Sequence, residues 1–184
     1  FNYDFPKFVF VGWLEEYKGV FDLLQSCSNI NKKGIEFHLT LVGNGNAEKN
    51  AKKFVRKNCL EESVTFLGWT NYQVVESVLE SNNIFVLPSW HEGLPNAMIE
   101  AMAAGLATVV TSVGVIPDFV KDGTHAILVP PKDIESLEIA LTKMAVDVEF
   151  RNKIALNGHK LAEDSFSVEK NIKRLGDIIE LQIK

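Results

Sequence analysis

Residues 84–105 read IFVLPSWHEGLPNAMIEAMAAG, and this stretch decides the fold. It opens with four consecutive apolar residues that Pro88 closes, a pattern typical of a short strand buried on both faces. An Ala- and Met-rich segment follows, with Pro95 suited to the first turn of a helix and Gly105 suited to its C-cap. The stretch therefore predicts a strand, a loop and a helix of the kind that builds a parallel sheet.

The same pattern recurs on both sides of this stretch. Apolar runs without in-and-out alternation stand at residues 7–11 (KFVFV), 37–42 (FHLTLV), 64–67 (VTFL), 107–111 (ATVVT) and 126–129 (AILV). Between them, apolar residues follow helical spacing, as at Val20, Leu23, Leu24 and Cys27 and at Val74, Val75, Val78 and Leu79. Right-handed crossovers between such strands give an α/β fold, a doubly wound parallel sheet covered by helices on both faces.

From residue 134 onward the pattern is helical only. Two apolar stripes, which we interpret as core-facing, are Leu137, Ala140, Leu141 and Met144, and Val168, Ile172, Leu175 and Ile179. No repeat and no flexible linker interrupts the sequence. We therefore expect one domain over residues 1–184 with a helical C-terminal tail.

Composition narrows the class of protein. The chain has 184 residues, 46% of them apolar, and a net charge of −5, which suits a packed domain and argues against a dedicated nucleic-acid binder. No uncharged apolar run approaches the ~20 residues that span a bilayer.

The chain starts Phe-Asn-Tyr-Asp, without an initiator Met or a signal peptide, so we expect it to be part of a longer protein. Cys27 and Cys59 are interpreted as free buried thiols of a cytosolic protein, and the alternative is a disulfide. The basic residues of 49–57 are interpreted as a solvated helix face, in preference to a membrane or phosphate patch.

The loop before Pro95 is a candidate ligand site, because open parallel sheets bind ligands beyond the carboxyl ends of their strands. A helix that starts there offers unpaired backbone N–H groups to a phosphate. Glu92 precedes this helix and Glu100 lies about one and a half turns inside it, where a carboxylate can accept hydrogen bonds from vicinal hydroxyls. The alternative interpretation is that both are exposed acids flanking a helix.

Other loops at the same edge carry weaker signals. Lys18 opens a helix after the first strand, where its ammonium could neutralise a diphosphate; the alternative is an ordinary exposed lysine. Gly43-Asn44-Gly45 resembles the start of a dinucleotide fingerprint, but Glu48 stands where the third glycine belongs, so a nicotinamide-dependent oxidoreductase is not favoured. The sequence has no Asp-x-Asp pair and no second His after His91-Glu92 at zinc-protease spacing, so we expect no metal.

These residues resemble a known family. The string EGLPNAMIEAMAAG (92–105) resembles the E-x7-E signature of the retaining glycosyltransferases of family four. Further ordered matches are FVGW-x4-KG (10–19), LVGNG (41–45), VTFLG (64–68), TSVGVIPDFVKDG (111–123) and LVPPKD (128–133). The resemblance covers residues 7 to 183 and implies the GT-B fold, two Rossmann-like domains with a cleft between them. This chain resembles only the carboxyl-terminal, donor-binding half, so the amino-terminal acceptor domain is expected to be absent from it.

The resemblance also implies a site for a nucleoside-diphosphate sugar, with no cofactor and no metal. Glu100 would hold the ribose hydroxyls and Glu92 the hydroxyls of the transferred sugar, with Lys18 countering the diphosphate charge. The catalytic residues would be Lys18 and Glu92, and the diphosphate would lie on the backbone of Leu94, Pro95, Asn96 and Ala97. Loops at Gly43-Asn44 and Gly68-Trp69 would border the base. The remaining members of the predicted donor-binding set are Gly12, Trp13 and Gly93.

One position departs from the family pattern in a way that bears on the donor. An Arg usually follows the first-strand glycine, and here the residue is Trp13, which removes one expected cation. Trp13 could stack on the ligand or pack as part of the structure, and we favour packing. Pro117-Asp118 is a milder departure, and Thr124-His125-Ala126 stands where the family more usually has a sequence that ends in Gly.

The function expected from the resemblance is anomer-retaining sugar transfer in polysaccharide or glycolipid biosynthesis. It would take place in the cytoplasm or at the inner face of the membrane, with peripheral contact through the full-length protein. This chain alone would be inactive. The alternatives are a GT-B sugar-nucleotide epimerase and a degenerate, non-catalytic nucleotide-binding module.

Overall fold

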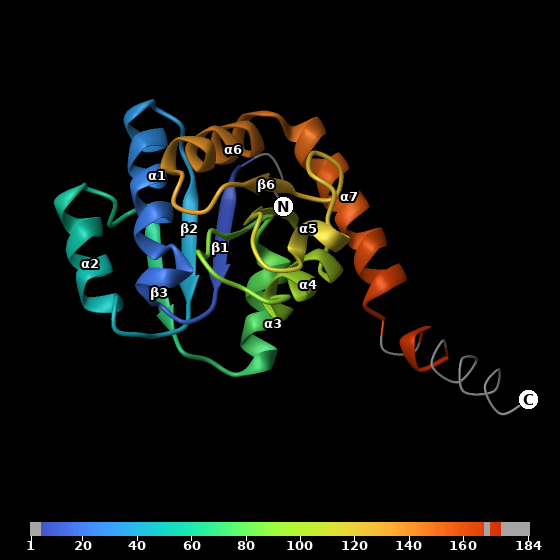
Figure 1. Cartoon of the computed structure of the whole chain (residues 1–184). Helices are drawn as coiled ribbons and strands as arrows, with labels where there is room; N and C mark the ends of the chain where they lie inside the picture. Colours follow the sequence, from blue (N-terminus) through green and yellow to red (C-terminus); the bar gives the residue numbers. More distant parts are fainter. Residues whose placement is uncertain (1–4, 168–169, 174–184) are drawn as a thin grey trace, which may run out of the picture.

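A six-stranded parallel sheet forms the centre of the molecule, with the strand order β3-β2-β1-β4-β5-β6 (Figure 1). The computed structural model describes residues 5–167 and 170–173. The strands are β1 (Lys7–Val11), β2 (His38–Val42), β3 (Val64–Gly68), β4 (Ile84–Leu87), β5 (Ala107–Thr111) and β6 (Ile127–Val129). Each predicted strand is present within one residue of its predicted bounds. The predicted α/β doubly wound parallel sheet is confirmed.

Helices cover both faces of this sheet. The helices are α1 (Val20–Lys32), α2 (Glu48–Lys57), α3 (Tyr72–Ser81), α4 (Asn96–Ala103), α5 (Ile116–Phe119), α6 (Ile134–Val146) and α7 (Val148–Ser165), with a short 3-10 helix η1 (Glu16–Lys18) before α1. Helix α1 packs against α6 on one face, and α4 packs against α7 on the other (Figure 1). Helices α6 and α7 follow the last strand and form the predicted helical tail.

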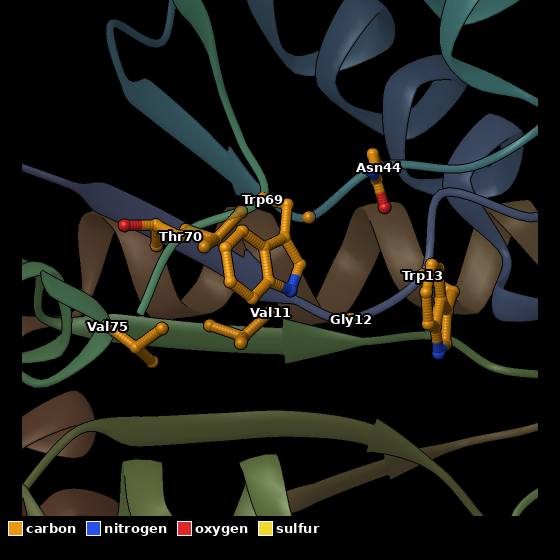
Figure 2. A pocket seen from close by; sticks show the side chains of 9 residues that line it. Val11, Gly12, Trp13, Asn44, Trp69, Thr70 and Val75 are labelled. Carbon is orange, nitrogen blue, oxygen red and sulfur yellow. The ribbon is translucent and has the colours of Figure 1, made fainter. Parts of the chain in front are cut away.

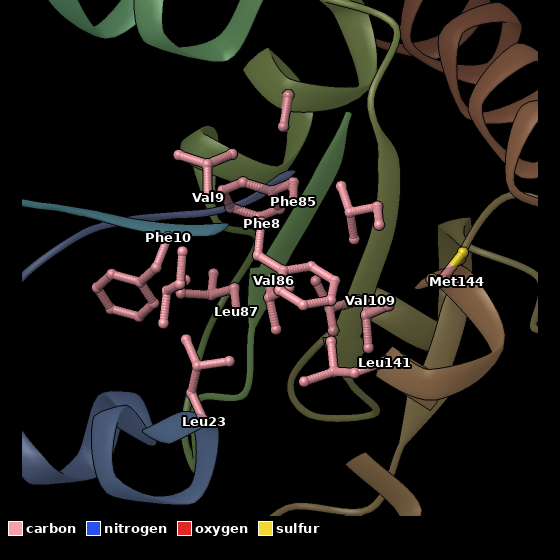
Figure 3. Packing of buried hydrophobic residues seen from close by; sticks show 14 of the residues in the cluster. Phe8, Val9, Phe10, Leu23, Phe85, Val86, Leu87, Val109, Leu141 and Met144 are labelled. Carbon is pink, nitrogen blue, oxygen red and sulfur yellow. The ribbon is translucent and has the colours of Figure 1, made fainter. Parts of the chain in front are cut away.

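The core lies where the sheet meets these helices (Figure 3). Phe8, Phe10 and Phe85 are fully buried in the two central strands, as consecutive apolar runs require. The stripe of α6 from Leu137 to Met144 is buried as predicted. Sequence reasoning did not find Arg151, which is 1% exposed and donates from Nη1 to the carbonyl of Met144 at 3.0 Å, at the end of α6.

Helix α4 shows how the deciding stretch folds locally. Its N-cap is Pro95, with φ −74° and ψ 121°, so the proline precedes the first turn rather than lying within it. At the other end, Gly105 adopts φ 80° and its N–H bonds to the Met102 carbonyl, while Leu106 bonds back to Ala101. These bonds form a Schellman motif, which explains why a glycine ends this helix.

Helix α3 is present where the spacing predicted a helix, and of its four apolar residues only Leu79 is buried. Val74 is 38% exposed, and Val75 and Val78 are only partly buried. The expectation that both cysteines are buried needs correction. Cys27 is buried and free as predicted, whereas Cys59 is free but exposed, in a left-handed turn just after α2.

The last apolar stripe was predicted to face the core. Ile172 is 66% exposed, so this residue does not face the core. Val168, Leu175 and Ile179 lie outside the described residues. Among the residues that are described, no helix is both long and apolar enough to cross a membrane.

Candidate functional site

The strand order reverses between β1 and β4, and this places the loops after these two strands next to each other. The two strands are paired in parallel through Phe8 with Ile84 and Val9 with Phe85. Chain connections leave β1 toward β2 and leave β4 toward β5, so a crevice opens between them at their carboxyl ends. The residues predicted to bind a ligand follow β1, β2, β3 and β4, and all four strands end at this edge.

Backbone hydrogen bonds join the loops after the first three strands. Leu14 donates its N–H to the Asn44 carbonyl at 2.8 Å, and Gly43 donates to the Gly68 carbonyl at 2.8 Å. Gly43 adopts φ 126°, and a Cβ added there would lie 2.0 Å from the Gly12 carbonyl oxygen. This close approach explains the glycine-rich turn that resembled a dinucleotide fingerprint.

A cavity of about 250 Å³ opens between these loops (Figure 2). It brings together five of the predicted donor-binding residues: Gly12, Trp13, Gly43, Asn44 and Trp69. Its other lining residues, which sequence reasoning missed, are Val11, Val42, Thr70 and Val75. Val11 and Val42 end their strands at the ligand edge, and this position was the signal that could have identified them. Gly68 does not line the cavity and instead holds the neighbouring loop through its carbonyl group.

Trp13 is not packed as part of the structure, which corrects the interpretation favoured above. Its side chain lies at the rim of the cavity with 58% of the residue exposed, and Trp69 is 73% exposed. Figure 2 shows the Trp69 indole beside Val11 and the Trp13 indole beyond Gly12, at the other end of the cavity.

Lys18 and Glu92 form an ion pair across the crevice. The distance from Lys18 Nζ to Glu92 Oε1 is 2.7 Å, and their side chains are only 17% and 10% exposed. Lys18 ends η1, whereas Glu92 lies in the loop between β4 and α4. From the sequence, the two residues are expected at different parts of a ligand, and their pairing with each other was not predicted.

The loop that carries Glu92 is held from the β1 side through Trp90. The Trp90 N–H bonds to the Tyr17 carbonyl at 2.7 Å, and its indole Nε1 donates to Asp22 Oδ2 at 2.7 Å. Lys132 places its ammonium 4.2 Å from the centroid of the Trp90 ring. These contacts fix the loop to η1 and α1, so the Lys18–Glu92 pair lies between two anchored segments.

A glycine after β5 supports the same loop from the other side. Gly114 adopts φ 59°, and a Cβ added there would lie 2.1 Å from the Glu92 carbonyl oxygen. The neighbouring Val115 N–H reaches the Gly93 carbonyl at 3.4 Å. Gly114 stands in the string TSVGVIPDFVKDG, so the motif contained it, but no pattern in these residues indicates that it contacts Glu92.

The start of α4 offers donors and an acceptor. The first helical bond runs from the Met98 N–H to the Pro95 carbonyl at 3.1 Å, so within the described chain the Asn96 and Ala97 amides lack a backbone acceptor. Glu100 is half-buried, and none of the bonds found among residues 5–167 and 170–173 involves its carboxylate. Gly93 is exposed, and Leu94 and Pro95 are half-buried on the same loop.

The described residues contain no cluster of three or more His, Cys, Asp or Glu side chains that could hold a metal ion. The chemistry that the site can offer comes from amide donors, two carboxylates, one ammonium and an aromatic cavity.

Comparison with known proteins gives the family. The family model described as glycosyl transferases group 1 matches residues 1–161. The chain is 27% identical to the amylovoran biosynthesis glycosyltransferase AmsK of Erwinia amylovora, over 92% of this chain and 43% of that protein. It therefore spans less than half the length of that curated relative.

Solved structures agree with the observed fold. Sucrose-phosphate synthase of Thermosynechococcus elongatus superimposes with a TM-score of 0.84 at 25% identity, over 100% of this chain and 47% of that one. Anabaena HepE, solved in complex with UDP-glucose, gives a TM-score of 0.83 at 19% identity, over 96% of this chain and 49% of that one, and shows likeness of fold alone. The match over residues 1–161 is decisive: the chain belongs to the glycosyl transferases group 1 family.

Proposed function

We propose that this chain is the donor-binding domain of a retaining glycosyltransferase that uses a nucleoside-diphosphate sugar. One observation carries the proposal: Glu92 and Glu100 flank the open amides at the start of α4, beside the crevice where the strand order reverses. This arrangement matches a ligand that has hydroxyl groups on both sides of a diphosphate. HepE, whose fold this chain shares, was solved with UDP-glucose.

The proposed donor runs from the aromatic cavity to the Lys18–Glu92 pair. The base occupies the cavity beside Asn44 and Trp69, and Glu100 accepts hydrogen bonds from the two ribose hydroxyls. The diphosphate lies on the backbone of the loop 93–97, where the helix dipole favours negative charge. The sugar reaches Glu92, which accepts its hydroxyls.

Binding of this donor requires the Lys18–Glu92 pair to open. Lys18 then turns to the diphosphate, and Glu92 becomes free to accept hydrogen bonds from the sugar. Lys18 and the α4 amides stabilise the charge that develops on the leaving diphosphate, which is the main catalytic contribution of this domain. The sugar keeps its anomeric configuration by attack from the same face.

The acceptor side of the reaction is proposed to lie in a domain outside this chain, so the chain alone transfers no sugar. Since AmsK is an amylovoran biosynthesis glycosyltransferase, we propose that the complete protein also acts in biosynthesis, in polysaccharide or glycolipid assembly. This activity would be cytoplasmic, with no metal or other cofactor. The epimerase and the degenerate binding module are not favoured, because the matching family and relatives are transferases.

A thermal-shift panel tests donor binding. The chain is heated with UDP, GDP, ADP and their sugar conjugates, and a ligand that binds only the folded state raises the melting temperature. We expect one nucleotide to give a selective shift that Glu100→Ala abolishes. Glu149→Ala removes an exposed carboxylate at the start of α7 and should keep the shift. The absence of a shift with every ligand at millimolar concentration would contradict the proposal.

A further inference from the structure

Two tryptophans at one cavity are the least expected feature of this surface. Single exposed apolar side chains are common in folded proteins, but Trp13 and Trp69 are both more than half exposed and line the same cavity. The rest of the lining is glycine, three valines, Asn44 and Thr70, with no charged side chain. Such a cavity suits a flat, uncharged ring with a few polar atoms on its edge.

Trp13 is held in place before any ligand arrives. On either side of it, the Gly12 N–H bonds to the Val42 carbonyl at 3.0 Å, and the Leu14 N–H bonds to the Asn44 carbonyl at 2.8 Å. The backbone of Trp13 is thus fixed to the loop that forms the opposite wall of the cavity. A ligand that stacks on the indole therefore binds a surface whose main chain is already ordered, which reduces the entropy lost on binding.

The cavity lining contains no charged side chain, so the identity of residue 13 affects the charge at this site. Trp13 occupies the position at which an arginine is expected from the family pattern. The nearest cation in sequence, Lys18, already has Glu92 at 2.7 Å, so the two charges cancel. A phosphate group that approaches this crevice therefore meets less net positive charge than the family pattern provides.

We propose that Trp13 is a specificity-determining residue that stacks on the nucleobase of the donor, so that this site selects its ligand by the aromatic base more than by phosphate charge. The inference rests on the proposed donor function and adds the part of the ligand that supplies the affinity. Loss of an aromatic side chain on which a base stacks weakens binding by about 10-fold. Stacking energy is also far less sensitive to salt than attraction between charges.

The test is a set of titrations of the chain with a nucleoside, its monophosphate and its diphosphate, for the base that gives the largest thermal shift. We expect Trp13→Ala to weaken all three ligands by the same factor, about 10-fold, and Trp13→Phe to restore most of the affinity. Trp13→Arg should weaken the nucleoside but favour the diphosphate. Its diphosphate affinity should fall more steeply between about 50 and 500 mM NaCl than that of the unmodified chain, because salt screens the added guanidinium charge. Tyr72→Ala, which removes a 64% exposed aromatic residue outside the cavity lining, is the matched control and should change nothing.

The outcomes separate this inference from the proposed function. If a diphosphate binds, Glu100→Ala weakens it and Trp13→Ala does not, the donor site stands and the stacking role is wrong. The same holds if the loss in Trp13→Ala grows with the number of phosphates, because that pattern indicates a role in the diphosphate region. If no nucleotide binds the unmodified chain, both fail together.

Discussion

Lys18 Nζ lies 2.7 Å from Glu92 Oε1, although 74 residues separate the two in the sequence. The pair joins the loop after β1 to the loop after β4, on the two sides of the point where the strand order reverses. Both side chains are largely shielded from solvent, so their interaction is screened less than that of a surface pair. In the proposed function, each partner has to leave the other before it can bind the donor.

The first prediction concerns that pair. Glu92→Gln keeps the shape of the side chain but removes the charge that neutralises Lys18. We expect nucleoside-diphosphate affinity to rise by about 3- to 10-fold, since charge-assisted bonds to phosphate contribute about 1 kcal/mol or more. Sugar transfer by the full-length protein should fall, because the hydroxyls of the sugar lose the carboxylate that accepts their hydrogen bonds. Calorimetry and a transfer assay measure the two effects.

The contrasting variant is Lys18→Met, which should lower diphosphate affinity and leave nucleoside affinity unchanged. Lys33→Met is its control, because Lys33 pairs with Glu138 on α6, away from the crevice. Equal affinities in Glu92→Gln, Lys18→Met and the unmodified chain would show that the pair does not interact with the donor.

A second prediction concerns Gly114. Its alanine variant combines two effects: a left-handed backbone conformation that alanine rarely adopts, and a methyl group 2.1 Å from the Glu92 carbonyl oxygen. The loop that carries Glu92 must therefore shift. Because small displacements of catalytic groups slow a reaction strongly, we expect about a 10-fold loss of sugar transfer by the full-length protein. Nucleoside binding should be kept, because neither Gly114 nor Glu92 lines the cavity.

Gly123→Ala provides the matched control for backbone strain. Gly123 has φ 66°, close to that of Gly114, but no atom lies within 4 Å of an added Cβ. Gly123→Ala should lose about 1 kcal/mol of stability from φ strain, and Gly114→Ala should lose at least as much because its methyl group also meets the Glu92 carbonyl oxygen; thermal melting measures both losses. Equal transfer activity in the two variants would contradict a positioning role for Gly114.

A third prediction concerns the buried Arg151. Its guanidinium donates to the carbonyls of Met144 and Ala145, at the end of α6. Arg151→Met should lower the free energy of unfolding by about 2 to 4 kcal/mol, because buried carbonyls lose a charged donor. Lys153→Met, an exposed residue on the same helix, should change it by less than about 0.5 kcal/mol. Urea denaturation measures both values, and equal stabilities would show that Arg151 contributes nothing there.

A fourth prediction concerns the stability of the fold at low pH. The Lys33 ammonium and the Asn29 amide bond to Glu138 and lower the pKa of its carboxyl below the ordinary value. A lowered pKa in the folded state contributes stability that is fully present above the unfolded-state pKa, and that stability is lost as the pH falls through the folded-state value. Glu138→Gln should therefore lower the stability at pH 7. The loss should be less than about 1 kcal/mol, because Lys33 in the Lys33–Glu138 pair is exposed to solvent. The loss should shrink below about pH 4.3, the pKa of glutamate in an unfolded chain. Melting curves at pH 7 and pH 3 compare the two proteins, and a cost that does not depend on pH would contradict this assignment.

The fold was predictable because its signal is local. A run such as KFVFV shows by its own residues that a strand is buried on both faces, and the strands appear where these runs predict them. The limits of α4 were also visible in Pro95 and Gly105, which differ from the prediction only in the place of the proline. Helix α3 is present as predicted, but its spacing did not show how much of it is covered, because the same spacing occurs in a helix that is only partly covered.

The site was predictable only in part, because its geometry depends on contacts between distant segments. The order of the strands could place Lys18 and Glu92 at one edge, but the pairing of their side chains depends on rotamers and on loops that Trp90 and Gly114 hold. Trp13 shows the same limit. A tryptophan is equally compatible with burial and with a ligand surface, and only the position of the loop decides which occurs.

The most direct test of the donor site is a calorimetric cycle between Glu100 and the ribose. The chain and its Glu100→Ala variant are each titrated with the preferred nucleoside diphosphate and with its 2′,3′-dideoxy analogue. We expect the unmodified chain to bind the dideoxy ligand about 10- to 100-fold more weakly, because that ligand lacks the hydroxyls that donate to the carboxylate. We also expect Glu100→Ala to bind both ligands equally. The same loss of affinity in both proteins would show that Glu100 does not hold the ribose and would contradict the account.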